Sequence, residues 1–302
     1  MEDFESYRTY LFSIAYRMTG SVSESEDIVQ DAYLRFSAVS TDEIRSVRSY
    51  LTTIVTRLCL DYLKSARVER EQYIGPWLPE PVLTPESGLL PSESVEMRES
   101  ISIAFLFLLE TLTPPERAVF LLHEVFDYPF PEIAEIIDKS PTNCRQIFHR
   151  AKDHLAERRP RFEPSPANQQ QLLTRFFAAC QAGSLPELTE VLARDVVAWS
   201  DGGGKASAAL RPILGLAAVK RYCLGVMRKL YRQYAEFFTV TIEEVNGAPA
   251  LLGWTEGHLF FLVTITGGQE IQEICTILNP EKLAHLQQQL TTHSRNPFAD
   301  NV

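Results

Sequence analysis

The chain lacks an apolar run long enough to cross a bilayer, which takes about 20 consecutive residues. Its first five residues, Met-Glu-Asp-Phe-Glu, are acidic where a secretory signal is basic. Cysteine is scarce, and the five present (59, 144, 180, 223 and 275) show no CxxC spacing. This scatter argues against a disulfide framework and a zinc site. We therefore expect a soluble cytoplasmic protein with no metal or cofactor, whose cysteines serve as small buried hydrophobic residues.

Positive charge is also in short supply, since the 302 residues carry a net charge of −10. Two segments depart from this balance: residues 45–70 and 141–161 each hold six Lys or Arg against two acidic residues, or +4 apiece. The other 255 residues then carry −18. Two basic segments on an acidic body suggest two DNA contacts that are weak without a partner, because phosphate neutralisation supplies most DNA affinity. Solvated helix faces are the alternative.

The segment 140–155 shows the strongest local pattern in the chain. Ser140 is a suitable helix cap, and Pro141 suits the first helical position. Apolar residues fall at helical spacing inside it: Cys144, Ile147, Phe148, Ala151 and Leu155. The polar and basic side holds Thr142, Asn143, Arg145, Gln146, His149, Arg150 and Lys152.

A shorter helix is predicted just upstream, over 131–137, and only Asp138 and Lys139 separate it from Ser140. Two helices joined by so tight a turn match the helix-turn-helix, whose second helix enters the DNA major groove. Asp138 stands where glycine is frequent, but Asp tolerates the left-handed conformation that the turn needs. An ordinary helical hairpin would show the same pattern.

The remaining N-terminal half is predicted to be helical. Helices are expected at 3–18, 23–36, 49–66, 95–112 and 113–124. Gly20 ends the first, Ser23 and Glu26 form a capping box for the second, and Thr113 with Pro114 opens the last. Residues 71–94 are a proline-rich linker in which Trp77 is expected to dock on another surface, and 161–167 are a second linker.

The pattern changes from residue 168. Helices are predicted at 168–181, 185–192 and 215–231, and strands at 195–200, 236–245, 249–255, 258–266 and 270–278. Helices followed by adjacent strands imply an α+β domain over 168–290, with a curved antiparallel sheet wrapping a helix. A flexible tail is expected over 291–302.

The first 160 residues resemble the extracytoplasmic-function sigma factors of bacterial RNA polymerase. The motifs that carry the resemblance are Glu26-Asp-Ile-Val-Gln-Asp-Ala-Tyr-Leu-Arg35, Ser49-Tyr-Leu-Thr-Thr-Ile-Val-Thr-Arg57, Asp61-Tyr-Leu-Lys64, Leu112-Thr-Pro-Pro-Glu-Arg117 and the helix-turn-helix. Trp77-Leu-Pro-Glu-Pro81, Asp201-Gly-Gly-Gly-Lys205 and Asn279-Pro-Glu-Lys-Leu283 resemble signatures of the subgroup with a SnoaL-like C-terminal extension. The resemblance implies two all-α sigma domains, 1–70 (region 2) and 95–160 (region 4), and a SnoaL-like α+β cone domain.

The resemblance also implies a role for each motif. Core polymerase would be bound through the β′ clamp helices and the β flap, with the second helix of the chain supplying Glu26, Asp27, Gln30, Asp31 and Leu34. The −10 promoter element would meet Arg45, Arg48, Arg57, Lys64 and Arg67, because strand capture needs cations. The −35 element would be read by the polar side of the 140–155 helix, where amides can pair with adenine and cations with guanine or phosphate.

The third domain is expected to regulate promoter binding from within the chain by packing on the sigma domains of a monomer. Residues expected at that regulatory contact are Trp77, Leu78, Pro79, Glu80, Pro81, Asp201, Gly202, Gly203, Gly204, Lys205, Asn279, Pro280, Lys282 and Leu283. An acidic extension could also mask the basic segments. Three successive glycines suit a close-approach turn, and the spacing of a phosphate-binding loop is absent.

Other functions remain open at this point. Asp201 and His258 could form an acid/base pair of an enzyme, although no second carboxylate or metal cluster supports it. The SnoaL-like domain could bind a ligand, and a one-component helix-turn-helix regulator with such a domain is the main alternative; it would not need residues 24–67. Cys144 could be a redox switch, but buried packing is the better reading of its position.

Overall fold

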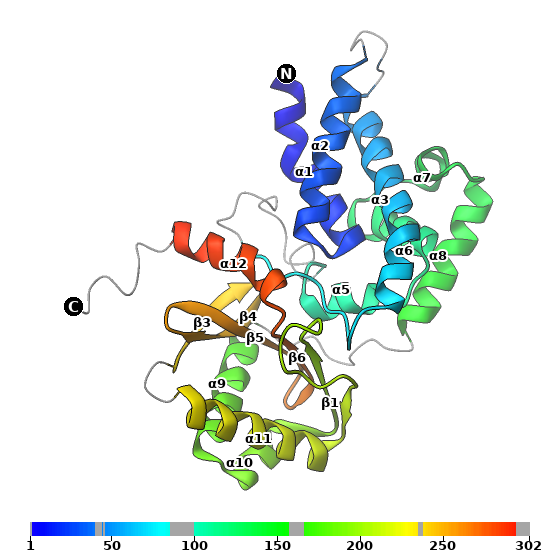
Figure 1. The fold of residues 1–302 in the computed structure, drawn as a ribbon. Helices are drawn as coiled ribbons and strands as arrows, with labels where there is room; N and C mark the ends of the chain where they lie inside the picture. Colours follow the sequence, from blue (N-terminus) through cyan, green and yellow to red (C-terminus); the bar gives the residue numbers. More distant parts are fainter. Residues whose placement is uncertain are drawn as a thin grey trace. The chain divides into compact units, whose positions relative to one another are not determined.

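The computed structural model describes residues 2–39, 44, 46–84, 100–156, 166–234 and 238–293 (Figure 1). The chain divides into two compact units. The first, here the helical unit, comprises Met1–Gln72, Pro85–Ile101 and Phe105–Arg159. The second, here the C-terminal unit, comprises Tyr73–Thr84, Ser102–Ala104 and Pro160–Val302. Residues 73–84 of the proline-rich segment thus group with a domain that begins some 80 residues later in the chain.

The helical unit holds the elements α1 (Glu2–Thr19), α2 (Val22–Ser37), α3 (Val47–Glu71), α5 (Ile103–Leu109, whose first two residues group with the C-terminal unit), α6 (Pro114–Phe120), the π-helical turn η2 (Leu121–Val125), α7 (Phe130–Ile137) and α8 (Pro141–Ala156). The helix predicted over 95–112 is shorter in the described residues, and 85–99 lie outside them. Gly20 ends α1 with φ 67°, as expected.

The start of α2 differs from the prediction. Ser21 is the cap, and its side-chain oxygen accepts from the Glu24 N–H at 3.4 Å, so the capping box over Ser23 and Glu26 is wrong. Ser21 and Glu24 have the same three-residue spacing as Ser23 and Glu26. Val22 is buried, and beginning the helix two residues earlier places it in the core. The Thr113 capping box is confirmed: the Thr113 N–H and hydroxyl both donate to Glu116 Oε2, at 3.0 and 2.7 Å.

The helix-turn-helix forms as predicted. Asp138 follows α7 in the left-handed conformation, with φ 55°, and Ser140 caps α8 through the Asn143 N–H at 3.2 Å. All five apolar residues of the α8 stripe are buried. Cys144 is wholly buried, and burial raises the pKa of its thiol, so it is a packing residue as expected. All five cysteines are free; four are buried and Cys223 is half-buried.

The C-terminal unit is an α+β domain. Its elements are α9 (Pro166–Ala182), α10 (Leu185–Val191), β1 (Leu192–Asp201), β2 (Ile213–Leu214), α11 (Leu216–Tyr234), β3 (Phe238–Val245), β4 (Ala248–Thr255), β5 (His258–Gly267), β6 (Ile271–Ile277) and α12 (Pro280–His293). The strands form one open sheet in the order β2-β1-β6-β5-β4-β3. The sheet was expected to be antiparallel, but β1 and β6 pair in parallel. The predicted strands are therefore present, but the sheet they form is mixed and not purely antiparallel.

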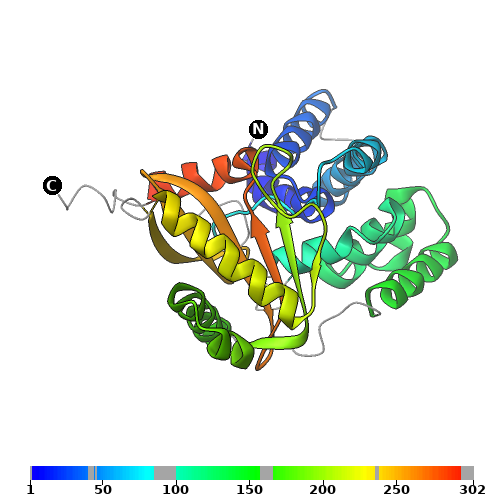
Figure 2. The ribbon, with the colours of Figure 1, turned by 60° about the horizontal axis from the view of Figure 1, so that its bottom comes forward.

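Helices α9, α10 and α11 cover one face of this sheet, and α12 lies on the other (Figures 1 and 2). The main core fills the first face and includes Leu173 of α9, Val219 of α11 and Phe261 of β5. Sequence reasoning missed α12, whose first turn is the Asn279–Leu283 motif. The Asn279 side chain caps it by accepting from the Glu281 N–H at 3.1 Å. Most of the predicted tail, 294–302, lies outside the described residues.

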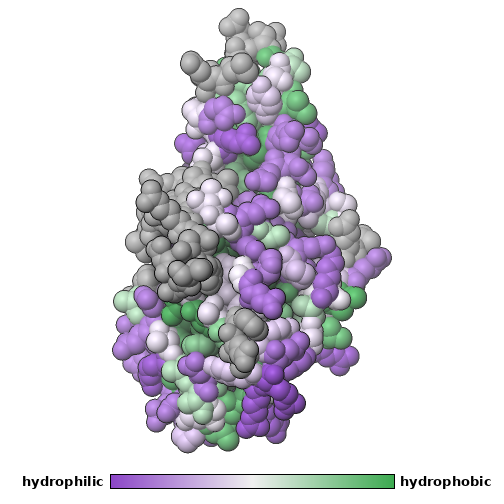
Figure 3. All heavy atoms as spheres, turned by 60° about the vertical axis from the view of Figure 1, so that its left-hand side comes forward, coloured by the Kyte–Doolittle hydropathy of each residue, from purple (hydrophilic) through white to green (hydrophobic). Residues whose placement is uncertain are grey.

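The described helices include none that is long and apolar enough to cross a membrane. On the face of the molecule in Figure 3, hydrophilic and hydrophobic residues are interspersed, and the hydrophobic ones gather in small groups. The large hydrophobic side chains that are exposed are Leu34 in the helical unit and Ile74, Leu185, Leu210, Leu214 and Val226 in the C-terminal unit.

Candidate functional site

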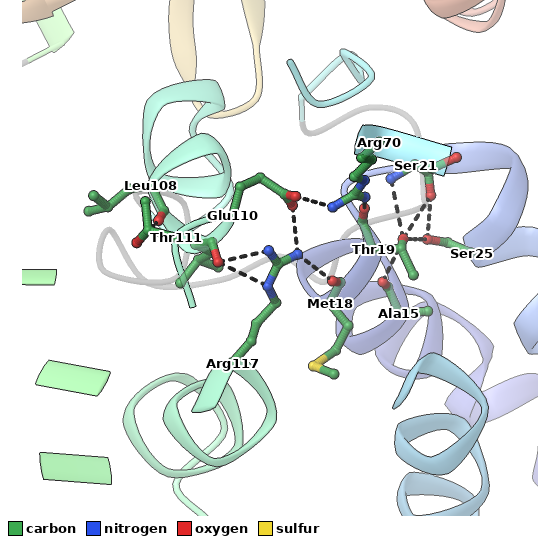
Figure 4. A network of polar contacts seen from close by, with 11 residues as sticks. Ala15, Met18, Thr19, Ser21, Ser25, Arg70, Leu108, Glu110, Thr111 and Arg117 are labelled. Atoms are coloured by element: carbon green, nitrogen blue, oxygen red, sulfur yellow. Dashed lines mark hydrogen bonds and ion pairs between the residues drawn. The ribbon is translucent and has the colours of Figure 1, made fainter. Parts of the chain in front are cut away.

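A buried cation joins distant segments of the helical unit (Figure 4). Arg117 of α6 is 3% exposed, and its guanidinium donates to the Leu109 carbonyl at 2.7 and 3.1 Å and to the Met18 carbonyl at 2.8 Å. It also pairs with Glu110 at 2.7 Å. Arg70, from the last turn of α3, pairs with the same carboxylate and donates to the Thr19 carbonyl at 2.7 Å. The network ties the end of α1 and the end of α3 to the α5–α6 corner.

Two cations predicted to meet the −10 element are exposed and also make contacts with other residues of the helical unit. Arg57 donates to the carbonyls of Ile136 and Glu135, at 2.9 and 3.1 Å, at the end of α7. Carbonyls at the end of a helix carry partial negative charge, so a guanidinium suits that position. The Arg48 guanidinium lies 4.5 Å from the ring centre of Tyr10.

The Arg48 site extends across the helical unit through Tyr128. The Tyr128 hydroxyl lies 2.9 Å from that of Thr52 on α3 and 3.1 Å from that of Tyr10 on α1. The Arg48 guanidinium lies 5.9 Å from the Tyr128 ring centre. The pKa of Tyr10 lies far above its usual range, mainly because the side chain is buried, so the hydroxyl stays protonated. The helix-turn-helix and the α1–α3 helices are thus in polar contact.

The other predicted −10 residues are differently placed. Lys64 is exposed and pairs with Asp61 at 2.8 Å, one turn earlier in α3. Arg45 and the side chain of Arg67 lie outside the described residues. Arg48, Arg57 and Lys64 are all exposed on α3, and Arg48 and Arg57 also make the contacts described above.

The recognition residues of α8 lie on its solvent side. Thr142, Arg145, Gln146, His149, Arg150 and Lys152 are exposed, and Asn143 is half-buried. Arg145 lies over the ring of Phe130 at 5.5 Å, and Lys152 pairs with Glu124 at 3.4 Å. Both cations are thus held near the helix while their charged ends stay accessible.

The residues predicted to bind core polymerase share one face of α2. Glu26, Asp27, Gln30, Asp31 and Leu34 are all exposed, and Leu34 is 57% exposed. Three carboxylates around an exposed leucine suit a basic partner surface with an apolar centre.

In the C-terminal unit, the residues expected at the regulatory contact come together around a buried carboxylate. Asp201 ends β1 and has no exposed surface. Its Oδ1 accepts from the Tyr73 hydroxyl at 2.6 Å, and its Oδ2 accepts from the Leu78 N–H and the Lys282 ammonium, each at 2.8 Å. Two of these three donors lie in segment 73–84, so the carboxylate holds that segment directly.

Lys282 completes this site from α12. Its ammonium lies 4.0 Å from the ring centre of Trp77 and 5.0 Å from that of Tyr73, and it also donates to the Leu78 carbonyl. A desolvated ammonium over an indole is a favourable cation–π contact. The expectation that Trp77 docks is met, and the partner comes from the same unit. Leu78, Pro79, Pro81 and Leu283 are buried around it, and Glu80 is half-buried.

The second half of segment 73–84 continues along the edge of the sheet. The Val82 N–H donates to the Asn246 side chain, and the Asn246 N–H donates back to the Val82 carbonyl, both at 2.9 Å. The Thr84 N–H donates to the Glu244 carbonyl at 3.0 Å. The Leu83 N–H is bound by Gln289 of α12 at 2.9 Å. With Asp201 at one end and the β3–β4 turn at the other, the segment is fixed along most of its length; we call it the docked linker.

Glycines are required where the chain turns against the docked linker. Gly203 and Gly204 have φ of 56° and 73°, a region that L-residues rarely adopt. A methyl group on Gly203 would lie 2.7 Å from the Tyr73 hydroxyl, and one on Gly204 would lie 2.8 Å from the Ile74 side chain. Lys205 leaves the turn and pairs with Glu281 of α12.

Comparison with known proteins identifies the family to which the chain belongs. Residues 4–68 match the family model of sigma-70 region 2, and residues 102–155 match that of sigma-70 region 4. The chain is 39% identical over 231 residues to the ECF RNA polymerase sigma factor SigJ of Mycobacterium tuberculosis, which covers 76% of this chain and 73% of SigJ. The chain is an extracytoplasmic-function sigma factor.

A second relative and a solved structure extend the similarity over nearly the whole sigma factor. The probable ECF RNA polymerase sigma factor SigI of M. tuberculosis is 32% identical over 292 residues, covering 95% of this chain and 96% of SigI. The crystal structure of M. tuberculosis SigJ superposes with a TM-score of 0.74 at 32% identity, covering 94% of this chain and 98% of that one. The sigma factor therefore binds core RNA polymerase and promoter DNA and directs transcription initiation, with a SnoaL-like third domain. The one-component regulator is not favoured.

The structure does not support Asp201 and His258 as a catalytic pair in this sigma factor. The Asp201 carboxylate is wholly buried and accepts three hydrogen bonds, whereas His258 is exposed at the start of β5. A general base must lie within hydrogen-bonding distance of a substrate proton. The buried Asp201 carboxylate, whose oxygens already accept hydrogen bonds from the protein, does not meet this condition.

The charge of the sigma factor is distributed differently from the prediction. Residues 166–302 hold 11 Lys or Arg and 12 Asp or Glu, a net charge of −1, so the third domain is not an acidic mask for the basic segments. Within that domain, residues 202–235 hold seven Lys or Arg and no Asp or Glu. Sequence reasoning missed this third basic segment, although a charge count along the chain shows it.

Substituting Gly203 tests the fit between the glycine turn and the docked linker. Gly203→Ala is expected to destabilise the C-terminal unit by more than the roughly 1–2 kcal/mol that a left-handed alanine costs, because its methyl group also meets the side chains of Asn279 and Tyr73. Gly183→Ala is the matched control, since Gly183 has φ 68° with nothing within 4 Å of an added methyl group. Urea unfolding of both variants measures the difference, and equal losses would show that the Asn279 and Tyr73 side chains yield without cost.

Proposed function

We propose that the C-terminal domain controls the sigma factor in cis by holding the docked linker. This segment, residues 73–84, lies in sequence between region 2 and region 4 but is bound by the third domain. The supporting observation is the buried Asp201 carboxylate, which accepts hydrogen bonds from the Tyr73 hydroxyl and the Leu78 N–H. Whatever alters that domain then alters the path of the chain between the two DNA-reading regions.

Docking of the linker limits how far apart region 2 and region 4 can lie. Region 2 and region 4 must bind promoter elements a fixed distance apart, and the chain between them has to span it. Twelve residues released into an extended chain reach about 40 Å, at 3.3–3.6 Å per residue. While the linker is docked, that length is unavailable, so docking sets which separations of the two regions are possible.

The polymerase contacts follow from the exposed faces of the two regions. The α2 face, with Asp27, Gln30 and Asp31 around Leu34, binds the β′ clamp helices. Region 4 binds the β flap. Complementary charge accelerates such an encounter, and the exposed leucine supplies apolar area at its centre.

The DNA contacts are divided between α8 and α3. The exposed side of α8 reads the −35 element, with Asn143 and Gln146 as amide donors and acceptors and Arg145 and Arg150 as cations. The −10 element meets Arg45, Arg48, Arg57, Lys64 and Arg67. Arg57 and Arg48 are exposed, but Arg57 is bound to α7 carbonyls and Arg48 lies over tyrosine rings, so both must exchange these contacts for phosphates when DNA binds.

The sigma factor acts as a monomer and is not an enzyme. The Asp201 carboxylate, which an isomerase-like reaction would need in a pocket, serves to hold the linker instead. The third domain is therefore assigned a mechanical role.

Transcription by reconstituted holoenzyme tests the control in cis. We compare the full chain, a chain ending at Leu283, which loses Gln289 and most of α12, and a chain ending at Ser165. Initiation from a promoter selected with the full-length factor is expected to change by about five-fold or more on truncation, the usual range of coupling between sites. Equal transcription by all three, with equal binding to core polymerase, would contradict control by the third domain.

A further inference from the structure

Helix α11 presents a basic surface that the two sigma regions do not account for. It lies along the outside of the C-terminal unit, with no other element in front of it in Figure 2. Arg221, Arg228, Lys229 and Arg232 are all exposed on it. We call these four residues the α11 basic face.

The three arginines of this face stand in one line. At 100° per residue, positions 221, 228 and 232 fall within an arc of about 40°, and at 1.5 Å per residue they span roughly 16 Å along the helix. The buried residues Val219 and Leu230 lie on the opposite side and pack into the core. The sequence of α11 thus separates an apolar side from a cationic one.

The carboxylates that the structure describes do not neutralise the face. None of its four cations forms an ion pair with a described residue, whereas Arg175 on α9 pairs with Glu190 at 3.8 Å and Lys220 donates to Thr189 at 2.6 Å. Like charges one helical turn apart, as at 228 and 232, destabilise a helix slightly. The arrangement therefore does not serve the stability of α11.

The charge of the third domain is polarised around this helix. Residues 202–235 carry +7, and the other residues between 166 and 302 carry −8, from four cations and twelve acids. A local positive field of this kind attracts polyanions even when the whole chain is acidic.

We propose that the α11 basic face binds the phosphate backbone of duplex DNA, as a third and sequence-independent contact of the sigma factor. Arginine suits this task because its planar fork donates two parallel hydrogen bonds to a phosphate. Gly225 is the other residue close to the line of the three arginines, so no aromatic ring stands on that line as a stacking platform for single strands. The proposal uses only the membership of a DNA-binding family and stands whether or not the third domain controls transcription.

The test is the salt dependence of DNA binding by the full-length chain. The double variant Arg221→Gln/Arg228→Gln removes two cations from the face. The control, Arg175→Gln/Arg194→Gln, removes two exposed cations from α9 and β1, so both variants have the same net charge. Binding to a mixed-sequence 40-base-pair duplex is measured by fluorescence anisotropy between about 50 and 200 mM KCl, a range in which phosphate contacts dominate the affinity.

The expected result is a smaller salt slope for the α11 variant alone. Each lost phosphate contact lowers the slope of log K against log salt by about 0.9, so the change is about 1.8. The control should keep the wild-type slope. Equal slopes for the two variants, or no duplex binding by the wild type at 50 mM KCl, would overturn the proposal. Weaker binding to core polymerase with an unchanged DNA slope would also overturn it, because the partner would then be an acidic protein surface. Circular dichroism establishes that both variants are folded.

Discussion

Asp201→Ala is expected to release the docked linker and to lower the free energy of unfolding of the C-terminal unit by about 3–5 kcal/mol. The reason is that Lys282, 5% exposed, would lose the carboxylate that its buried ammonium donates to. The Leu78 N–H and the Tyr73 hydroxyl would lose the acceptors they have now. Urea unfolding measures the loss, and hydrogen exchange at the Leu78 amide reports the release of the linker.

Two further variants decide whether the carboxylate acts through this contact. Asp195→Ala removes an exposed acid from the same strand and should change stability by less than about 0.5 kcal/mol. Asp201→Ala/Lys282→Met removes both buried charges and should recover part of the loss, since no unpaired charge remains. If the double variant is no more stable than Asp201→Ala alone, the unpaired Lys282 charge is not the source of the loss and the ion pair does not hold the linker.

Arg117→Met is expected to have the second largest effect, because it removes the buried cation at the centre of Figure 4. Methionine keeps much of the length of the side chain, but the Met18 and Leu109 carbonyls lose the guanidinium as a donor, and Glu110 loses one of its two cations. Breaking such a buried pair costs about 3–5 kcal/mol. For a unit of this size that corresponds to a fall in Tm of roughly 6–20 °C. Thermal unfolding followed by circular dichroism checks the value.

The control for Arg117 is an exposed ion pair of the same unit. Arg8 pairs with Glu5 at 3.7 Å, and both side chains are more than half exposed. Arg8→Met should lower Tm by little, because surface pairs contribute less than about 1 kcal/mol. An Arg117→Met protein that melts together with the Arg8 variant would show that region 2 and region 4 do not depend on this network for their contact.

The features that could be predicted from the sequence are those that local signals determine. The cap at Ser140, the left-handed Asp138 and the stripe from Cys144 to Leu155 all lie within one helix-turn-helix, and each is present. The predicted strands are likewise right, because alternation of side chains is a local property. The failure at Ser23 was also local, since two overlapping Ser-x-x-Glu patterns compete and only the burial of Val22 separates them.

What the sequence could not predict depends on pairing between distant segments. Alternation identifies β1 and β6 as strands but does not reveal that they run in parallel. The three motifs around Trp77, Asp201 and Asn279 were expected to meet, yet the buried Lys282 ammonium between Trp77 and Asp201 was visible only once the chain was folded. Helix α12 had a usable signal, an Asn-Pro-Glu start, but its role in holding Leu83 through Gln289 required the structure.

The order of the chain gives the docked linker a consequence during protein synthesis. Leu78 and its partner Lys282 are 204 residues apart in sequence. At about 5–20 residues per second, the ribosome needs roughly 10–40 s to make the stretch between them. Region 2, the linker and region 4 all leave the ribosome within that interval, before α12 exists. Each newly made molecule therefore passes through a period in which both DNA-reading regions are complete and nothing yet holds the segment that joins them.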